Sequence, residues 1–538
     1  MAAEPAGSSP FIKEVEGHQA MYRRVIDLFH SSTKAAFVML LAAIVALVVA
    51  NTALYDAFYG FWHTEVGFFF GEHVAGMSLA HVINDILMAV FFLLVGLEIK
   101  YEMTVGELTN IRQALLPIMA AVGGVLVPIA VYLAFNAANP ASAHGWGVPT
   151  ATDIAFALGI MALLGNRVPN GIRVFLSTLA VADDIIAIIV IAVFYGQSPS
   201  VPWLLGAAVV LAALIALNRF HVYSLAPYLI GGVVLWYCVF SSGVHSTIAG
   251  VLLALAIPSG SRVNLRSFIS WSGERVREAH ELYEPESPVI GQKEYMSTVA
   301  SLSKVAKQVV PPATRLEKRL YPWVYFGILP LFALTNADVA LSGVGLGEMV
   351  ASPAFLGVLL GLVVGKPVGI LLMSLIIVKT RLASLPENVT WGHMVGAGIL
   401  GGVGFTMAIF VANLAFDDPA LVATAKLAIL VASLLAGVIG FAVLFVQARE
   451  ARERGVAYVS MLEEDGAQQT ADAEHARADK RWLDLFGTPL IMREAERYRS
   501  EYGRYGEIVI TIGPAGLRGG EAKAGESQND SAQDGPAR

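Results

Sequence analysis

The feature that most constrains this chain is a succession of apolar segments, each about as long as a lipid bilayer is thick. A membrane-spanning helix needs about 20 predominantly apolar residues, and the first such run begins at Ala35. Charged residues make up 15% of the sequence, whereas about 25% is usual in soluble domains. Twelve candidate spans centre near residues 44, 91, 127, 157, 185, 209, 231, 251, 330, 366, 403 and 434. We therefore predict an all-α polytopic membrane protein with about 12 transmembrane helices.

The distribution of lysine and arginine among the predicted loops orients these spans. Basic residues precede the first span, are missing from 54–77, and return at Lys100 and Arg112. The alternation continues through the last span. By the positive-inside rule both termini are then cytoplasmic, and the pattern fits an even count of twelve. The predicted parts are a cytoplasmic segment at 1–33, a membrane domain at 34–448 with a cytoplasmic loop at 259–320, and a cytoplasmic, partly disordered tail at 449–538.

Three segments outside the spans have patterns of their own. The stretch at 61–79 alternates around glycine and predicts a short hairpin on the outer side. The long loop contains a charged, helical pattern at 275–282. The tail has a pattern that predicts a helix at 481–498, and its polar end is typical of disorder. No catalytic or ligand motif occurs in the tail.

Charge and cysteine content exclude several classes of function. The net charge of −7 argues against a nucleic-acid partner, because such a partner favours a basic face. Cys238 is the single cysteine, so the chain has neither an intrachain disulfide nor a cysteine-based metal cluster. We expect Cys238 to serve packing.

Four charged residues lie inside predicted spans, where each costs roughly 2.5–3.5 kcal/mol. Asp183 and Asp184 are at the middle of one span, Lys366 is at the middle of another, and Asp153 lies in a third. Consecutive helical residues point about 100° apart, so one aspartate can pair with Lys366 while the other faces a cavity. The remaining acid must be protonated or hold a cation. The alternative is a purely structural ion-pair cluster.

Two of the predicted spans are interrupted in a corresponding way. Pro149 and Thr152 precede Asp153, which predicts a half-helix that starts at Thr152. The segment "GAGILGGVGFTMAIF" has five glycines within nine residues, which disfavours one continuous helix. Such paired interruptions are typical of transporters with inverted repeats, here at about 114–195 and 354–444. Close helix packing is the alternative use of glycine, and we expect it for Gly123 and Gly124.

Five segments together resemble the NhaA family of sodium/proton antiporters. They are "ATDIAFALG", "ADDIIAIIVIAVFY", "SGVHSTIAG", "GKPVGI" and "GVGFTMAIF", and the resemblance extends from about Ser31 to Val446. It implies inverted-topology repeats with two broken helices that cross within the membrane. It also implies a secondary transporter and not an enzyme, without a cofactor, in the bacterial inner membrane and as a homodimer.

The resemblance implies a role for each matching residue. Asp184 matches the principal ligand of Na⁺ and carrier of the proton, and Asp183, which belongs to the same metal-binding pair, matches the partner of Lys366. Asp153 and Thr152 match the crossing of the broken helices.

The acidic funnel of the family is matched only in part. Glu98, Glu102, Glu317 and His245 match positions linked to the response to pH. Three positions differ from those of relatives: Tyr101 stands where a basic residue is expected, and Lys318 and Tyr321 stand where some relatives have histidine. We therefore do not transfer the family's pH profile to this chain.

Competition for one carboxylate gives the expected mechanism. Na⁺ or Li⁺ binds the deprotonated form, so cation and proton exclude each other at Asp184, and alternate opening of the site yields exchange. If Asp183 or Lys366 carries a second proton, two protons move per Na⁺ and the cycle is electrogenic. The sequence leaves open which of the two does so.

Two other classes of protein use similar features. An intramembrane aspartyl protease also has two aspartates, but its Gly-x-Gly-Asp sequence does not occur here. A sodium-coupled symporter of small organic solutes can share the broken-helix fold, but it needs a polar cavity. The central spans here are almost purely aliphatic, which favours a bare ion.

Overall fold

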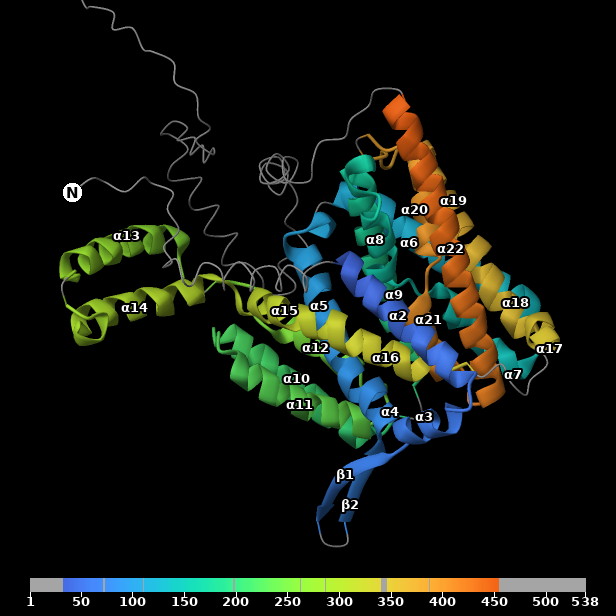
Figure 1. The fold of residues 1–538 in the computed structure, drawn as a ribbon, viewed down its shortest axis with the longest axis horizontal. Coiled ribbons are helices and arrows are strands. Elements are labelled where there is room, and N and C mark those ends of the chain that lie inside the picture. Colours follow the sequence, from blue (N-terminus) through green and yellow to red (C-terminus); the bar gives the residue numbers. More distant parts are fainter. Residues whose placement is uncertain are drawn as a thin grey trace, which may run out of the picture. The chain divides into compact units, whose positions relative to one another are not determined.

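The computed structural model describes residues 32–70, 73–109, 111–196, 199–261, 263–285, 287–339, 346–386 and 388–453, and it is mostly helical there (Figure 1). The predicted helix at 481–498 lies outside these residues. So do nearly all of the predicted N-terminal segment and of the tail.

Within the described residues, seven helical stretches are long and apolar enough to cross a membrane, or eight if one bent pair counts as a span. Several of the stretches correspond to single long helices: α2 (Ser32–Ala50), α6 (Ile111–Asn136), α9 (Asn170–Phe194), α10 (Val201–Arg219) and α22 (Pro419–Glu453). α11 (Leu225–Ser241) is apolar but shorter. The fold is thus polytopic, and α22 continues five residues beyond the membrane-domain boundary predicted at 448.

Several other predicted spans consist of helices that are too short to cross a membrane alone. Fewer than twelve single stretches are therefore long enough. α8 (Ile154–Ala162) and α12 (Ile248–Ala256) have nine residues each. The span near 403 is split into α20 (Trp391–Gly401) and α21 (Phe405–Ala415), which are bent by 43° relative to each other. Gly401, Gly402 and Gly404 are at this break, where glycine weakens helical continuity. The interruption predicted from the glycine run is confirmed.

Three other spans contain a wider, π-helical turn. These turns are η1 (Val82–Leu87) before α5 (Met88–Thr104), η6 (Val324–Ile328) between α15 (Pro312–Trp323) and α16 (Leu329–Asn336), and η7 (Gly361–Gly365) between α18 (Pro353–Leu360) and α19 (Lys366–Lys379). Single π-turns inside helices are frequent at functional sites. Periodicity did not predict them.

Short elements connect the spans. They are α3 (Tyr55–Trp62), α4 (Leu79–His81), η2 (Glu107–Thr109), α7 (Pro140–Ala143), η3 (His144–Thr150), η4 (Gly165–Arg167), η5 (Val289–Gly291) and α17 (Leu346–Ala351). The strands β1 (Glu65–Phe70) and β2 (His73–Ser78) pair antiparallel with Glu65 opposite Ser78. The hairpin predicted at 61–79 is confirmed.

The long loop forms two helices that pack on each other, α13 (Leu265–Leu282) and α14 (Lys293–Val309). The predicted charged helix at 275–282 is the last part of α13. The backbone N–H of Ala313 donates to the carbonyl of Pro258 over 3.3 Å. The chain therefore leaves and re-enters the membrane domain at neighbouring points.

Apolar packing divides the membrane domain into two bundles. One buried cluster joins side chains of α6, α8, α9, α19, α20 and α22, and α21 follows α20 along the chain; we call this set the core bundle. Another cluster joins α5, α10, α11, α12 and α15. With η1, which precedes α5, and with η6 and α16, which follow α15, we call this set the flanking bundle. The core bundle comprises most of the two stretches predicted to be repeats, and a third cluster joins residues of both bundles and of α2.

Candidate cation and proton site

The two adjacent aspartates on α9 have different surroundings. Asp183 Oδ2 accepts a hydrogen bond from Lys366 Nζ over 2.6 Å, and these side chains are 1% and 0% exposed. Lys366 Nζ also donates to the backbone carbonyl of Thr150. The lysine, at the first position of α19, thus links α9, α19 and the segment before α8. A buried charge needs such a partner, and Asp183 supplies it.

Asp184 has no such partner. It is 3% exposed, it forms no ion pair within the described residues, and its Oδ1 atom has no hydrogen-bond partner there. Its side chain lines a cavity of about 20 Å³, which is room for one water molecule or an ion of similar size. One aspartate is therefore neutralised by the lysine, and the other faces a small cavity.

Asp153 lies where the two broken helices meet. Its Oδ1 accepts from the backbone N–H of Phe156 in α8 over 3.0 Å, and its Oδ2 accepts from the backbone N–H of Thr406 in α21 over 3.2 Å. The Thr406 hydroxyl donates to the same Oδ2 over 2.5 Å. One carboxylate thus caps the N-terminal ends of two half-helices, where N–H groups lack helical partners and favour negative charge.

The crossing itself is held by backbone contacts. The N–H of Asp153 donates to the carbonyl of Val403 over 2.8 Å, and the Thr152 hydroxyl donates to the carbonyl of Gly401 over 2.9 Å. The predicted start of the half-helix at Thr152 is wrong, because α8 begins at Ile154 with Asp153 as its cap. The Thr152 hydroxyl instead satisfies a carbonyl at the end of α20.

The wall of the cavity opposite Asp184 comes from the flanking bundle. Glu98 of α5 and Tyr325 of η6 line it, and the Tyr325 hydroxyl donates to Glu98 Oε1 over 3.5 Å. Asp153 and Thr406 complete its polar lining. Glu102 and Glu317 are close enough to Glu98 to interact with it electrostatically. Three carboxylates therefore face one small space, namely Glu98, Asp153 and Asp184.

Other predicted residues lie away from this cavity. Asp183 and Thr152 do not line it. His245 lies in the turn between α11 and α12, where its Nε2 donates to the carbonyl of Tyr195 over 2.5 Å. Sequence reasoning missed Thr406 and Tyr325. Thr406 could have been identified as a polar residue two positions after the last glycine of the "GVGFTMAIF" break. No feature of the sequence marks Tyr325.

Comparisons with known proteins point to one family. A family model described as Na⁺/H⁺ antiporter 1 matches residues 26–444. The chain is 44% identical over 433 residues to a Na⁺/H⁺ antiporter NhaA of Wolinella succinogenes, covering 80% of this chain and 95% of that protein. It is 44% identical over 411 residues to one of Helicobacter pylori strain G27, covering 76% and 92%. It is 42% identical over 431 residues to one of Janthinobacterium sp. strain Marseille, covering 78% and 92%.

Proposed function

The chain belongs to the NhaA family of Na⁺/H⁺ antiporters, and we propose that Asp184 is the group at which it binds sodium ion and proton in turn. It is a multi-pass membrane transporter that exchanges Na⁺ for H⁺, and it is not an enzyme. The proposal further includes Li⁺ as a substrate. It also includes sodium extrusion and pH homeostasis as the roles of the transporter in the cell.

The observation that carries the proposal is an unpaired buried carboxylate beside oxygen ligands. Asp184 has no cationic partner among the described residues, and Asp153 and Thr406 contribute oxygen atoms to the same cavity. Hard cations favour carboxylate and other oxygen ligands. Burying the charge of Asp184 alone is costly, so in this dry surrounding the carboxylate binds either a proton or a cation. This competition couples the two fluxes.

Asp183 and Lys366 supply the second proton in this proposal. In the structure they neutralise each other. If Asp183 turns toward the incoming cation, Lys366 loses its counterion, and a fully buried lysine without a partner releases its proton. Two protons then leave for each Na⁺ bound, and the cycle is electrogenic. Asp183 becomes a cation ligand only in that second arrangement.

The small cavity argues against a sodium-coupled symporter of organic solutes. The cavity of about 20 Å³ accommodates a water molecule or a bare ion, whereas sites for drug-sized molecules usually occupy 300–1,000 Å³. Residues of the lining other than the polar ones named above are aliphatic, aromatic or methionine. Na⁺ and H⁺ are the substrates that suit these walls.

The proposal includes a topology of twelve crossings with both termini on the cytoplasmic side of the bacterial inner membrane. In it the seven long stretches and the shorter elements α8, α11, α12, η6–α16 and α20–α21 make up the twelve crossings, and the two stretches of the core bundle are inverted repeats. The segment at 1–33 and the tail at 449–538 are cytoplasmic in this proposal, and 34–448 is the membrane domain. We place the homodimer contact at the β1–β2 hairpin.

Glu98, Glu102, Glu317 and His245 are proposed to adjust activity to pH. Burial raises the pKa of the Glu317 carboxyl above its ordinary value, against the lowering effect of the neighbouring Lys318. Glu317 therefore gains its charge at a higher pH than an exposed glutamate does. Each negative charge gained near Glu98 changes the potential at the cytoplasmic mouth of the cavity.

Transport by membrane vesicles tests the role of Asp184. In inside-out vesicles with an imposed pH gradient, Na⁺ and Li⁺ should dissipate the gradient for the unmodified protein and for Asp417→Asn, an exposed aspartate outside the cavity. Asp184→Asn should show no cation-dependent dissipation, because an amide cannot exchange a proton for a cation. Exchange at the unmodified rate in Asp184→Asn would exclude the proposal. Adding K⁺ in the same assay measures selectivity.

The proposed stoichiometry needs a separate measurement. A cycle that moves two protons per Na⁺ transfers net charge, so a voltage of one sign accelerates exchange and the opposite sign slows it. Proteoliposomes clamped with K⁺ and valinomycin at opposite voltages should therefore differ in their exchange rates. Equal rates at both voltages would show electroneutral exchange.

A further inference from the structure

Three asparagines from three elements join in one hydrogen-bond network inside the membrane domain. Asn336, at the end of α16, exchanges two hydrogen bonds with Asn84 of η1, over 2.8 and 3.3 Å. Asn413 of α21 donates to the same Asn336 Oδ1 over 2.7 Å. Asn336 is 4% exposed. Neither the cation site nor the crossing of the broken helices uses these groups.

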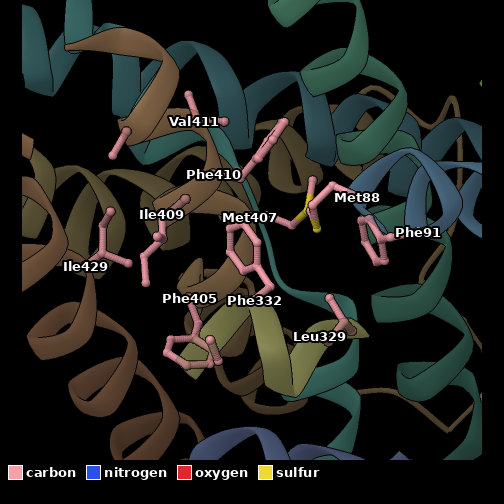
Figure 2. Packing of buried hydrophobic residues seen from close by; sticks show 14 of the residues in the cluster. Met88, Phe91, Leu329, Phe332, Phe405, Met407, Ile409, Phe410, Val411 and Ile429 are labelled. Carbon is pink, nitrogen blue, oxygen red and sulfur yellow. The ribbon is translucent and has the colours of Figure 1, made fainter. Parts of the chain in front are cut away.

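The network is separated from the cavity by a layer of apolar side chains. Figure 2 shows the residues of this layer, Met88, Phe332 and Phe410, gathered beside Met407, which lines the cavity. The ring centroids of Phe332 and Phe410 are 6.3 Å apart.

The order of layers is the same on all three elements. On α16 and the turns before it, Asn336 is followed toward the cavity by Phe332, and then by Leu329, which lines the cavity. Along η1 and α5 the order is Asn84, Met88 and Phe91. Along α21 it is Asn413, Phe410 and Met407. Each step is three or four residues, which is about one helical turn. The apolar layer and the network therefore close one side of the cavity.

The closed side is the outer one by the charge of the loops. Asn84 is near the start of the span that follows 54–77, Asn336 precedes 337–352, and Asn413 precedes "AFDDPAL"; none of these three connecting stretches contains lysine or arginine. Glu98 lies 14 residues beyond Asn84 on the same helix, roughly 20 Å toward the cytoplasmic end. Access from outside therefore requires the apolar layer and the network to separate.

The network crosses the boundary between the two bundles. Asn84 and Asn336 belong to the flanking bundle, while Asn413 belongs to the core bundle, which carries Asp184. A second contact crosses the same boundary nearby: Lys426 Nζ of α22 pairs with Asp338 Oδ1 over 3.2 Å, and these side chains are 12% and 15% exposed. Movement of one bundle against the other must break both contacts.

We propose that Asn84, Asn336 and Asn413 form a latch that holds the outer side of the cavity closed, and that release of Asn413 opens Asp184 to the outside. Buried carboxamides that lose their partners are costly, so the intact network stabilises the outward-closed form. When the bundles separate, outer water replaces the lost partners. The location of Asn84 in a π-turn, η1, fits a segment that changes its hydrogen bonding.

Kinetics measured from the two faces test the latch. Asn413→Ala removes the contact that crosses the boundary and should shift the ratio of outward-open to outward-closed forms about three- to tenfold, as expected for one buried hydrogen bond. The apparent KM for Na⁺ should fall at the outer face and rise at the cytoplasmic face. Right-side-out and inside-out vesicles measure the two values.

Asn136→Ala is the matched control. Asn136 Nδ2 donates to the carbonyl of Pro353 over 2.9 Å, a buried amide contact between α6 and α18. Both elements lie in the stretches predicted to be repeats, so this substitution removes an equivalent bond without touching the boundary. The ratio of the two KM values should stay unchanged in Asn136→Ala. A ratio that does not shift in Asn413→Ala, or that shifts equally in both variants, would overturn the latch.

Cross-linking tests the same barrier without removing the network. In a Cys238→Ser background, Asp338→Cys with Lys426→Cys places two thiols at the outer contact between the bundles. A short, reducible bifunctional methanethiosulfonate should stop exchange, and a reductant should restore it. The control is Gly206→Cys with native Cys238, where a Cβ at position 206 is 3.6 Å from the Cys238 sulfur and the bridge joins α10 to α11 within the flanking bundle.

An unchanged rate of Na⁺/H⁺ exchange after cross-linking of positions 338 and 426 would also overturn the inference. An equal loss of exchange after cross-linking of the control pair would do so too. The inference rests on the proposed binding of Na⁺ at Asp184. The two failures are distinguishable. Continued exchange by Asp184→Asn would refute the proposed binding at Asp184, whereas an unchanged KM ratio in Asn413→Ala would refute the latch.

Discussion

Asp183 and Asp184 are neighbours in sequence with opposite environments, because consecutive positions of a helix face different directions. Asp183 points at Lys366 and is neutralised, whereas Asp184 faces the cavity and has no cationic partner among the described residues. The geometry fits the proposed division, in which Asp183 balances the charge of Lys366 and Asp184 binds the cation. Adjacent carboxylates thereby avoid competing for one counterion.

Substitution of Lys366 tests the balance between these charges. Lys366→Met leaves Asp183 buried without a counterion, and breaking a buried pair by removing one partner destabilises a protein by about 3–5 kcal/mol. The melting temperature of the purified protein in detergent should fall clearly. The double variant Asp183→Asn with Lys366→Met should recover most of the loss, since it leaves no charge unpaired. A double variant that melts no higher than Lys366→Met would contradict this reading.

Thr406 tests how far the site depends on hydrogen bonding to Asp153. Thr406→Val keeps the shape but removes the hydroxyl that donates to Asp153 over 2.5 Å. A hydrogen bond to a charged group contributes about 1.5–3 kcal/mol, so the apparent KM for Na⁺ should rise at least about tenfold. Thr406→Ser, which restores the donor, should remain near the unmodified value. Equal impairment of both variants in vesicle exchange would assign the effect to packing instead.

At the scale of elements, close approach of helices positions the lysine. A Cβ added at Gly123 of α6 would lie 2.3 Å from the carbonyl of Gly369 in α19. The two backbones are therefore in contact one turn from Lys366. This confirms the packing role predicted for Gly123 and shows that the lysine's position depends on two glycines.

Gly123→Ala should force α6 and α19 apart at this contact. Overpacking of this kind costs about 1–3 kcal/mol, and it displaces Lys366 from Asp183. Both the melting temperature and the rate of exchange should therefore fall. Gly206→Ala is the matched control, because its Cβ would meet an ordinary contact at 3.6 Å. Equal melting temperatures for the two variants would contradict the predicted contact.

Sequence patterns predicted elements where one residue type dominates local structure. The glycine run located the α20–α21 break, and the alternation around glycine located the β1–β2 hairpin. The start of α8 was misplaced because Thr152 and Asp153 are both good caps, and only the contact with Val403 decides between them. The π-turns and the network around Asn336 were missed because they arise from contacts between distant segments. Tyr325 was missing from the predicted site for the same reason.

At the scale of the whole molecule, the proposed cation ligands and the other wall of the cavity belong to different bundles. Asp184, Asp153 and Thr406 are in the core bundle, and Glu98 and Tyr325 are in the flanking bundle. A relative movement of the bundles then changes which side reaches Asp184 while its ligands stay together. This division suits exchange of one small ion for protons.

The helical pair α13–α14 should be dispensable for exchange. Pro258 and Ala313 are joined by a backbone hydrogen bond, so replacing residues 263–309 by a short glycine–serine linker closes the chain with little strain. The ion pairs within α13 are exposed, and such pairs contribute little stability. The shortened protein should retain its exchange rate and its KM for Na⁺ in vesicles. Loss of exchange at normal expression would show that the pair acts on the bundles.

Proton release on sodium binding tests the central claim most directly, because it needs neither a membrane nor a full cycle. Purified protein in weakly buffered detergent solution should release between one and two protons when Na⁺ is added, as a pH-indicator dye records. Asp184→Asn should release none, whereas Asp417→Asn should match the unmodified protein. Unchanged proton release from Asp184→Asn would contradict the claim that proton and sodium ion compete for this carboxylate.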